Sequence, residues 1–182
     1  MGSPIALARL LLDHSQRVLV DNLADLTLEE ALFTPMGGYR SVLGTLKHVA
    51  GWSHVYRSFA FDEQPTNWYE LDWPWGLRDR IDLSHAYLAD VIAWLSQSHQ
   101  QWQDSLSAVG EEQVDLPRSL HWGQTVPLSE IVIMAASHDV YHAGEINQLL
   151  SIYRSEAWEV GEEVEENHIS TIGHRVKPAW QR

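Results

Sequence analysis

Residues 127–153 read PLSEIVIMAASHDVYHAGEINQLLSIY and show the three-to-four-residue periodicity of a long amphipathic helix. This periodicity places eight side chains on one helix face, namely Leu128, Ile131, Ala135, His138, His142, Glu145, Leu149 and Ile152. Because the apolar members of the face should pack against the rest of the protein, we expect its two histidines and its glutamate to be buried among them. A buried polar group without a partner costs about 1–3 kcal/mol, so this cluster requires partners.

The two histidines of this face are four residues apart, so their imidazoles should lie one helical turn apart. Two imidazoles in that arrangement can chelate one metal ion, and the helix would then supply half of a metal site. The same spacing also suits a pair of core histidines that hydrogen-bond to Glu145 and neighbouring groups. Spacing and burial alone leave both interpretations open.

The composition limits the partners that the protein can bind. The chain has 182 residues, a length typical of one domain with a sizeable core, and its formal net charge is −13. Nucleic acids and anionic membranes are bound by clustered lysine and arginine, so we expect no nucleic-acid partner and no membrane partner. The chain contains no cysteine, so disulfides and thiolate ligands are excluded. Any metal ligands from side chains should therefore be histidine, aspartate or glutamate.

The sequence shows neither a signal segment at its start nor an apolar run of the roughly 20 residues that cross a membrane. We therefore expect a cytoplasmic protein that acts on a small-molecule substrate. The nine tryptophans are many for this length and indicate aromatic packing or an aromatic-lined pocket.

Four amphipathic segments predict four long helices, over residues 3–23, 41–61, 81–109 and 127–153. Ser3, which is followed by Pro4, and Ser41 are residue types that cap helix N-termini. The remaining segments predict long connections, over residues 24–40, 62–80 and 110–126. The predicted fold is therefore all-α, a four-helix bundle with long interhelical connections.

The C-terminal part of the chain differs in composition from the bundle. From residue 154 the sequence is rich in glutamate and then ends in a stretch that contains His168, His174 and Trp180. Its isoleucine, valine and tryptophan residues suggest an acidic extension that packs back on or near the bundle. We therefore divide the chain into a bundle, residues 1–153, and a C-terminal tail, residues 154–182.

The segment 41–61 carries one ionisable residue on its mostly apolar face. His48 shares that face with Thr45, Trp52, Val55 and Phe59. A lone histidine in this setting is more often a hydrogen-bonded core residue than a metal ligand. The face by itself therefore favours a core residue.

The loop 62–80 contains several tryptophans, for which we consider two roles. They either pin a long loop to the bundle or roof a ligand pocket. A bundle without metal, with a ligand pocket roofed by Trp73 and Trp75, is accordingly one hypothesis for the function.

Two motifs resemble a known family when they are taken together and in order. The sequence GTLKHVAGW at residues 44–52, followed by HDVYHAGEI at residues 138–146, is similar to motifs of the DinB-like (DNA-damage-inducible) superfamily. The resemblance extends over roughly residues 5–153. It implies a four-helix bundle that is often a homodimer and that holds a divalent metal ion through three histidines. By position the matching ligands are His48, His138 and His142.

The chain departs from the family pattern at Glu145, where glutamine is frequent. A carboxylate at this position can orient an imidazole, act as a fourth ligand, or serve as an acid or base. Three histidine ligands leave coordination positions open for water or substrate, as in catalytic rather than structural sites. They do not select the metal, so zinc, nickel, iron and manganese all agree with the ligand set.

Members of the family that the chain resembles include thiol S-transferases and isomerases that use a low-molecular-weight thiol. The resemblance therefore implies a metal-dependent enzyme, a thiol S-transferase or a hydrolase, in which a thiol or water attacks a small electrophile. Other members have no assigned activity. The alternative is accordingly a non-catalytic metal-binding or stress-related dimeric bundle.

Overall fold

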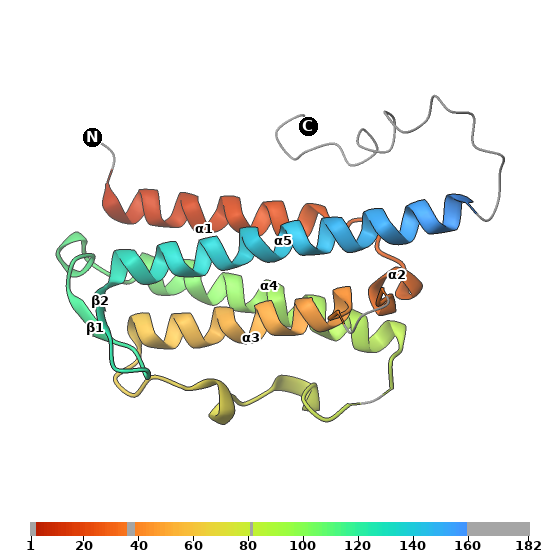
Figure 1. Cartoon of the computed structure of the whole chain (residues 1–182). Helices are drawn as coiled ribbons and strands as arrows, with labels where there is room; N and C mark the ends of the chain where they lie inside the picture. The colour runs from red at the N-terminus through yellow and green to blue at the C-terminus, as the bar shows by residue number, and fades with distance from the viewer. Residues whose placement is uncertain (1–2, 36–38, 81, 160–182) are drawn as a thin grey trace.

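Four long helices form a bundle in the computed structural model, which describes residues 3–35, 39–80 and 82–159 (Figure 1). They are α1 (Pro4–Asp21), α3 (Val42–Phe61), α4 (His85–Ser107) and α5 (Leu128–Glu159). Helix α1 packs on α5 and α4, and α3 packs on α4 and α5. The helices α3 and α4 run in the same direction, so the chain returns along the bundle between them (Figure 1). The predicted all-α bundle with long connections is confirmed.

Helix α5 is the element that positions the candidate site, because it packs against both α1 and α3. Five of the eight residues on the predicted face are buried, namely Leu128, Ile131, Ala135, His142 and Leu149, and the other three, His138, Glu145 and Ile152, are half-buried. A second stripe is also buried, and it consists of Val132, Ala136, Ala143, Ile146 and Leu150. The buried surface of α5 is therefore about twice as wide as one stripe, as contact with two neighbouring helices requires.

Serine side chains cap three of the four long helices. Ser3 accepts a hydrogen bond from Ala6 N at 3.2 Å, and Ser41 accepts one from Gly44 N at 3.1 Å, as predicted. The third long helix begins at His85, because Ser84 caps it through Tyr87 N. The predicted start near residue 81 is therefore wrong by four residues. Leu83 therefore lies before the helix, and it is exposed.

The connections contain short elements that the sequence pattern did not predict. Within 24–40 there is a short helix, α2 (Leu28–Leu32), which starts with a capping box between Thr27 and Glu30. Residues 110–126 contain a two-stranded antiparallel sheet, in which Arg118 pairs with Val126. The strands of this sheet are β1 (Pro117–Ser119) and β2 (Thr125–Pro127). The connections also contain three short 3₁₀ helices, η1 (Trp68–Glu70), η2 (Pro74–Gly76) and η3 (Glu111–Gln113).

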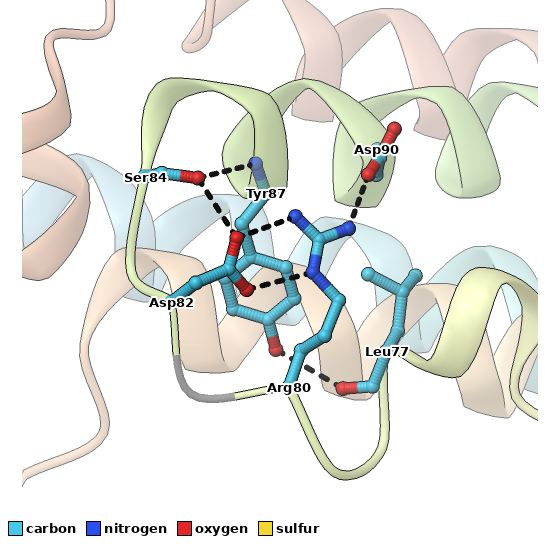
Figure 2. A network of polar contacts seen from close by, with 6 residues as sticks. All are labelled: Leu77, Arg80, Asp82, Ser84, Tyr87 and Asp90. Carbon is cyan, nitrogen blue, oxygen red and sulfur yellow. Dashed lines mark hydrogen bonds and ion pairs between the residues drawn. The ribbon is translucent and has the colours of Figure 1, made fainter.

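The connection between α3 and α4, residues 62–84, is a return loop. Arg80 anchors the end of this loop to the start of α4 (Figure 2). Its guanidinium donates two hydrogen bonds to Asp82, at 2.7 and 2.9 Å, and a further one to Asp90. Ser84 donates to the same Asp82 carboxylate, and the Tyr87 hydroxyl donates to Leu77 O at 3.1 Å. The hydrogen bonds from Arg80 lower the pKa of Asp82 to about 2.

Replacing Asp82 with asparagine is expected to remove a pH-dependent part of the stability. A carboxylate with a lowered pKa stabilises the fold above its unfolded pKa of about 3.9, and this stabilisation disappears as the pH falls through about 2. The melting temperatures of parent and Asp82→Asn should therefore differ at pH 6 and converge near pH 2. Because the pair is exposed, added salt should reduce the difference at pH 6. A difference that is independent of pH would contradict this account.

The return loop packs against α3 through tryptophan side chains. Trp68 stacks on Trp52 with ring centroids 5.3 Å apart, and Trp73 contacts Trp68 and Trp94. Gly51 makes this approach possible, because a Cβ at this position would lie 2.8 Å from Trp68 Cζ3. Trp68 and Trp73 therefore pin the loop to the bundle, which is one of the two predicted roles.

A side chain at position 51 is expected to push the loop away from α3. Overpacking of this kind typically costs about 1–3 kcal/mol, so Gly51→Val should lower the free energy of unfolding by that amount. Urea denaturation of the variant beside the parent measures it, with Gly144→Ala as the control. Gly144 also lies within a helix, but no atom is within 4 Å of a Cβ built there. Equal destabilisation by both substitutions would contradict the packing argument.

Helix α5 continues to Glu159, six residues past the predicted boundary at residue 153. An ion pair ties this extension to α2, because Arg154 Nε lies 2.7 Å from Glu30 Oε1. The rest of the predicted tail, residues 160–182, lies outside the described residues, as do His168 and His174. None of the described helices has the length and apolar character that crossing a membrane requires.

Candidate metal centre

Three imidazoles from two helices converge beside a cavity. His48 comes from the first half of α3, and His138 and His142 come from successive turns of α5. His138 Nε2 lies 3.2 Å from His48 Nε2 and 3.2 Å from His142 Nε2. One ring nitrogen from each of the three residues lies within 4.8 Å of the others. The structure thus brings together the three histidines that the sequence predicted.

The two Nε2–Nε2 distances of 3.2 Å fit a shared metal ion. Nitrogen ligands about 2.0–2.1 Å from one ion and about 90–110° apart lie about 2.9–3.4 Å from each other. The two Nε2 contacts of 3.2 Å fall inside that range. Three neutral imidazoles without an ion satisfy these contacts less well. A hydrogen bond between two ring nitrogens requires a proton on one of them and a lone pair on the other. An ion at the centre would accept a lone pair from all three nitrogens.

Glu145 contacts the outer nitrogen of one imidazole. Its Oε2 lies 2.6 Å from His142 Nδ1, so the Nδ1–H donates a hydrogen bond to the carboxylate and the lone pair of the ring stays on Nε2. The Tyr141 side chain also favours the charged form of this carboxylate. Burial alone would raise the pKa of Glu145, but the interactions with His142 and Tyr141 bring it below its usual value. The glutamate is therefore charged at neutral pH.

The environment keeps two of the imidazoles neutral. Burial is the main cause that lowers the pKa of His48 to about 4 and that of His138 to about 3. The positive charge of Arg40 lowers both pKa values further. His138 Nδ1 is buried and has no hydrogen-bond partner among the described residues. Metal ligation requires neutral imidazoles, so these two are ready to bind at neutral pH.

Aromatic rings surround the outer side of the cluster. The His48 ring lies 5.6 Å from that of Trp68 and 6.2 Å from that of Trp52, and the Tyr56 ring lies 5.6 Å from that of His138. This wall explains why His48 sits in an aromatic face without being an ordinary core histidine. Its Nε2 contacts His138 of α5.

The histidines open into a cavity of about 740 Å³, which is large enough for a small organic ligand. The cavity is lined by the three histidines together with Pro35, Tyr39, Arg40, Thr45, Trp52, Tyr56, Tyr141, Glu145, Gln148, Leu149 and Ile152. Trp73 and Trp75 do not line it. Trp73 packs on the core and Trp75 is exposed, so these two residues do not roof the cavity beside the histidines.

Asp139 lies beside the site and was missed by the sequence analysis. It belongs to the second buried stripe of α5, where Ser15 of α1 donates a hydrogen bond to its Oδ2 at 3.3 Å. Burial raises the pKa of Asp139 to about 7. Two features of the sequence could have indicated it, namely its position between Ala136 and Ala143 and the polar Ser15 between the apolar Leu12 and Leu19 of the first helix. The residue joins α1 to α5 and does not line the cavity.

Comparison with known proteins agrees with the motifs. The sequence model of the DinB superfamily matches residues 11–146, which include all three histidines and Glu145. A search of curated proteins found no match. The family match therefore supports a metal-binding bundle without specifying a reaction.

Proposed function

Because this chain belongs to the DinB superfamily and carries a convergent three-histidine cluster, we propose that it is a metal-dependent enzyme. In this proposal His48, His138 and His142 hold a divalent transition metal ion. The reaction is the transfer of a low-molecular-weight thiol, or of water, onto a small electrophilic substrate. The observation that carries the proposal is the meeting of three Nε2 atoms at the wall of a cavity.

The residues of the site have separate tasks in this proposal. Glu145 holds the proton on His142 Nδ1 and thereby directs the Nε2 lone pair towards the cluster. Trp52 and Tyr56 give the substrate an apolar surface and limit the access of water to the histidines. A divalent ion with open coordination positions lowers the pKa of a thiol or of water and so supplies a nucleophile at neutral pH.

The attacking sulfur or oxygen forms a bond to the electrophilic carbon and releases its proton. The leaving group departs with the electron pair of the bond that breaks. Glu145 lines the cavity and remains ionised, so its carboxylate is available to accept this proton. Its first task is nevertheless the contact with His142, which is short and direct.

Turnover assays test the proposal directly. Metal-loaded protein is incubated with a panel of low-molecular-weight thiols and small electrophiles, and product is measured over time. We expect turnover in the parent, none in His138→Ala, and parental rates in His99→Ala. His99 is a half-buried histidine of α4 that does not line the cavity, so it is a matched control. Stoichiometric metal without turnover across the panel would favour the non-catalytic alternative, a metal-binding or stress-related bundle.

We also propose that the protein forms a homodimer. Large apolar side chains are exposed on the two adjacent helices, with Leu7 and Leu10 on α1 and Ile133 and Val140 on α5. An exposed apolar surface of this kind is typical of protein interfaces. Sedimentation equilibrium at micromolar concentration should give twice the chain mass of 20.8 kDa. A mass of one chain across the concentration range would refute the dimer.

A further inference from the structure

Arg40 lines the cavity, and the proposed metal chemistry gives it no role. Among the described residues that line the cavity, Arg40 carries the only permanent positive charge and Glu145 the only negative charge. The charge of Glu145 is already engaged by His142 and Tyr141. Within the described residues Arg40 has no ion pair, since the arginines that have one are Arg17, Arg57, Arg80 and Arg154. Its guanidinium is thus available to a ligand.

The stem of Arg40 is held against the first turn of α3. A Cβ at Gly44 would lie 2.7 Å from Arg40 Cγ and 3.4 Å from Arg40 Cδ, so the absence of a side chain at Gly44 makes room for the arginine. Arg40 immediately precedes Ser41, the residue that caps the helix. The side chain therefore packs on a fixed element, although its end is exposed. A guanidinium held in this way loses less conformational freedom when it binds an anion.

The other lining residues define the rest of the ligand. Four aromatic side chains, Tyr39, Trp52, Tyr56 and Tyr141, line the same cavity as Arg40 and the histidines and give it apolar surface. A guanidinium binds carboxylates with two parallel hydrogen bonds, which an uncharged group of the same shape cannot match. The chain as a whole carries a net charge of −13, which disfavours anions elsewhere on the surface.

We propose that Arg40 recognises a carboxylate, so that the cavity selects small organic acids with an aromatic or apolar body. The carboxylate lies at Arg40 and the body lies on the aromatic side chains, with the far end directed to the histidines. This inference deepens the proposed function, on which its catalytic meaning rests, because it names the substrate class of the same site. It makes Arg40 a specificity-determining residue.

Binding to metal-free protein tests the inference apart from the metal chemistry. The probes are 4-phenylbutyrate and its uncharged counterpart 4-phenylbutyramide, and the readout is calorimetry together with the tryptophan fluorescence of the cavity. The parent should bind the carboxylate about tenfold more tightly than the amide at low salt, because a hydrogen bond to a charged group is the stronger one. Arg40→Gln should bind both equally while it keeps the parental affinity for the amide. Retained amide binding shows that the variant still has an intact cavity.

Two further variants make the test specific. Gly44→Ala should lower the preference for the carboxylate although Arg40 is still present, because the new methyl group displaces the arginine stem. Arg17→Gln should keep the full preference, because Arg17 pairs with Asp13 on the exposed side of α1 and does not line the cavity. This control carries the same charge change as Arg40→Gln.

The inference is overturned if the parent binds both probes equally, if neither binds at millimolar concentration, or if Arg40→Gln keeps the preference. These results and the tests of the proposed function can be told apart. A protein that shows the Arg40-dependent preference but never binds metal would refute the metal enzyme and leave the carboxylate site in place. An active metal enzyme without the preference would refute the carboxylate site alone.

Discussion

Loading the metal-free protein with its divalent ion is expected to raise the free energy of unfolding by about 4 kcal/mol when the free ion is a thousandfold above its dissociation constant. The reason is that the three nitrogens meet only in the folded chain, since His48 and His138 are 90 residues apart in sequence. For a chain of this size the gain corresponds to a rise of about 8–16 °C in the melting temperature. Thermal unfolding with and without the ion measures it.

In the variant His142→Ala, addition of the ion is expected to leave the melting temperature unchanged. His142 is buried, so its removal also destabilises the metal-free fold, and the comparison is therefore made between loaded and metal-free samples of the same variant. His99→Ala should show the parental rise. If the melting temperature of the parent does not respond to the ion, or if His142→Ala responds as the parent does, the histidines are a hydrogen-bonded core cluster.

The second large effect concerns Glu145, whose removal is expected to weaken metal binding about 10–100-fold. Without the carboxylate, nothing holds the proton of His142 on Nδ1, and the ring can present a protonated Nε2 to the cluster. Glu145→Gln should lose less affinity than Glu145→Ala, because an amide oxygen still accepts the hydrogen bond. Competition titration against a chelator of known affinity measures both variants.

The pair of substitutions also separates the roles that a carboxylate can have at this position. If Glu145 were a direct ligand, Gln and Ala would weaken binding alike, and if it acted only as an acid or base, neither would change affinity. Glu130→Ala is a suitable control, since it removes the same charge from an exposed position of α5. Unchanged affinity in Glu145→Ala would contradict the orienting role.

Most of the site could be predicted from the sequence, because three of its residues are close in sequence on one helix. His138, His142 and Glu145 are spaced by four and three residues, and any helix brings such residues onto one face. The participation of His48 was different. Its own segment favoured a core residue, and only the order of the two motifs placed it with the other histidines.

The features that the sequence did not predict depend on contacts between distant segments. Asp139 is buried because α5 packs on α1 as well as on α3, and one stripe of periodicity does not reveal the second neighbour. Arg40 comes from a connection whose path is fixed by tertiary packing, so no spacing connects it with the cavity. The start of α4 at His85 is set by Ser84 and by the network of Arg80, which competes with the helical pattern upstream.

The most direct measurement of the central claim is elemental analysis of the protein purified without a histidine tag or a chelating column, beside its His138→Ala variant. The account predicts one equivalent of a divalent transition metal per chain in the parent and none in the variant, and it leaves the element to be identified by the same measurement. Absence of metal from both proteins, even after incubation with zinc, nickel, iron and manganese, would contradict it.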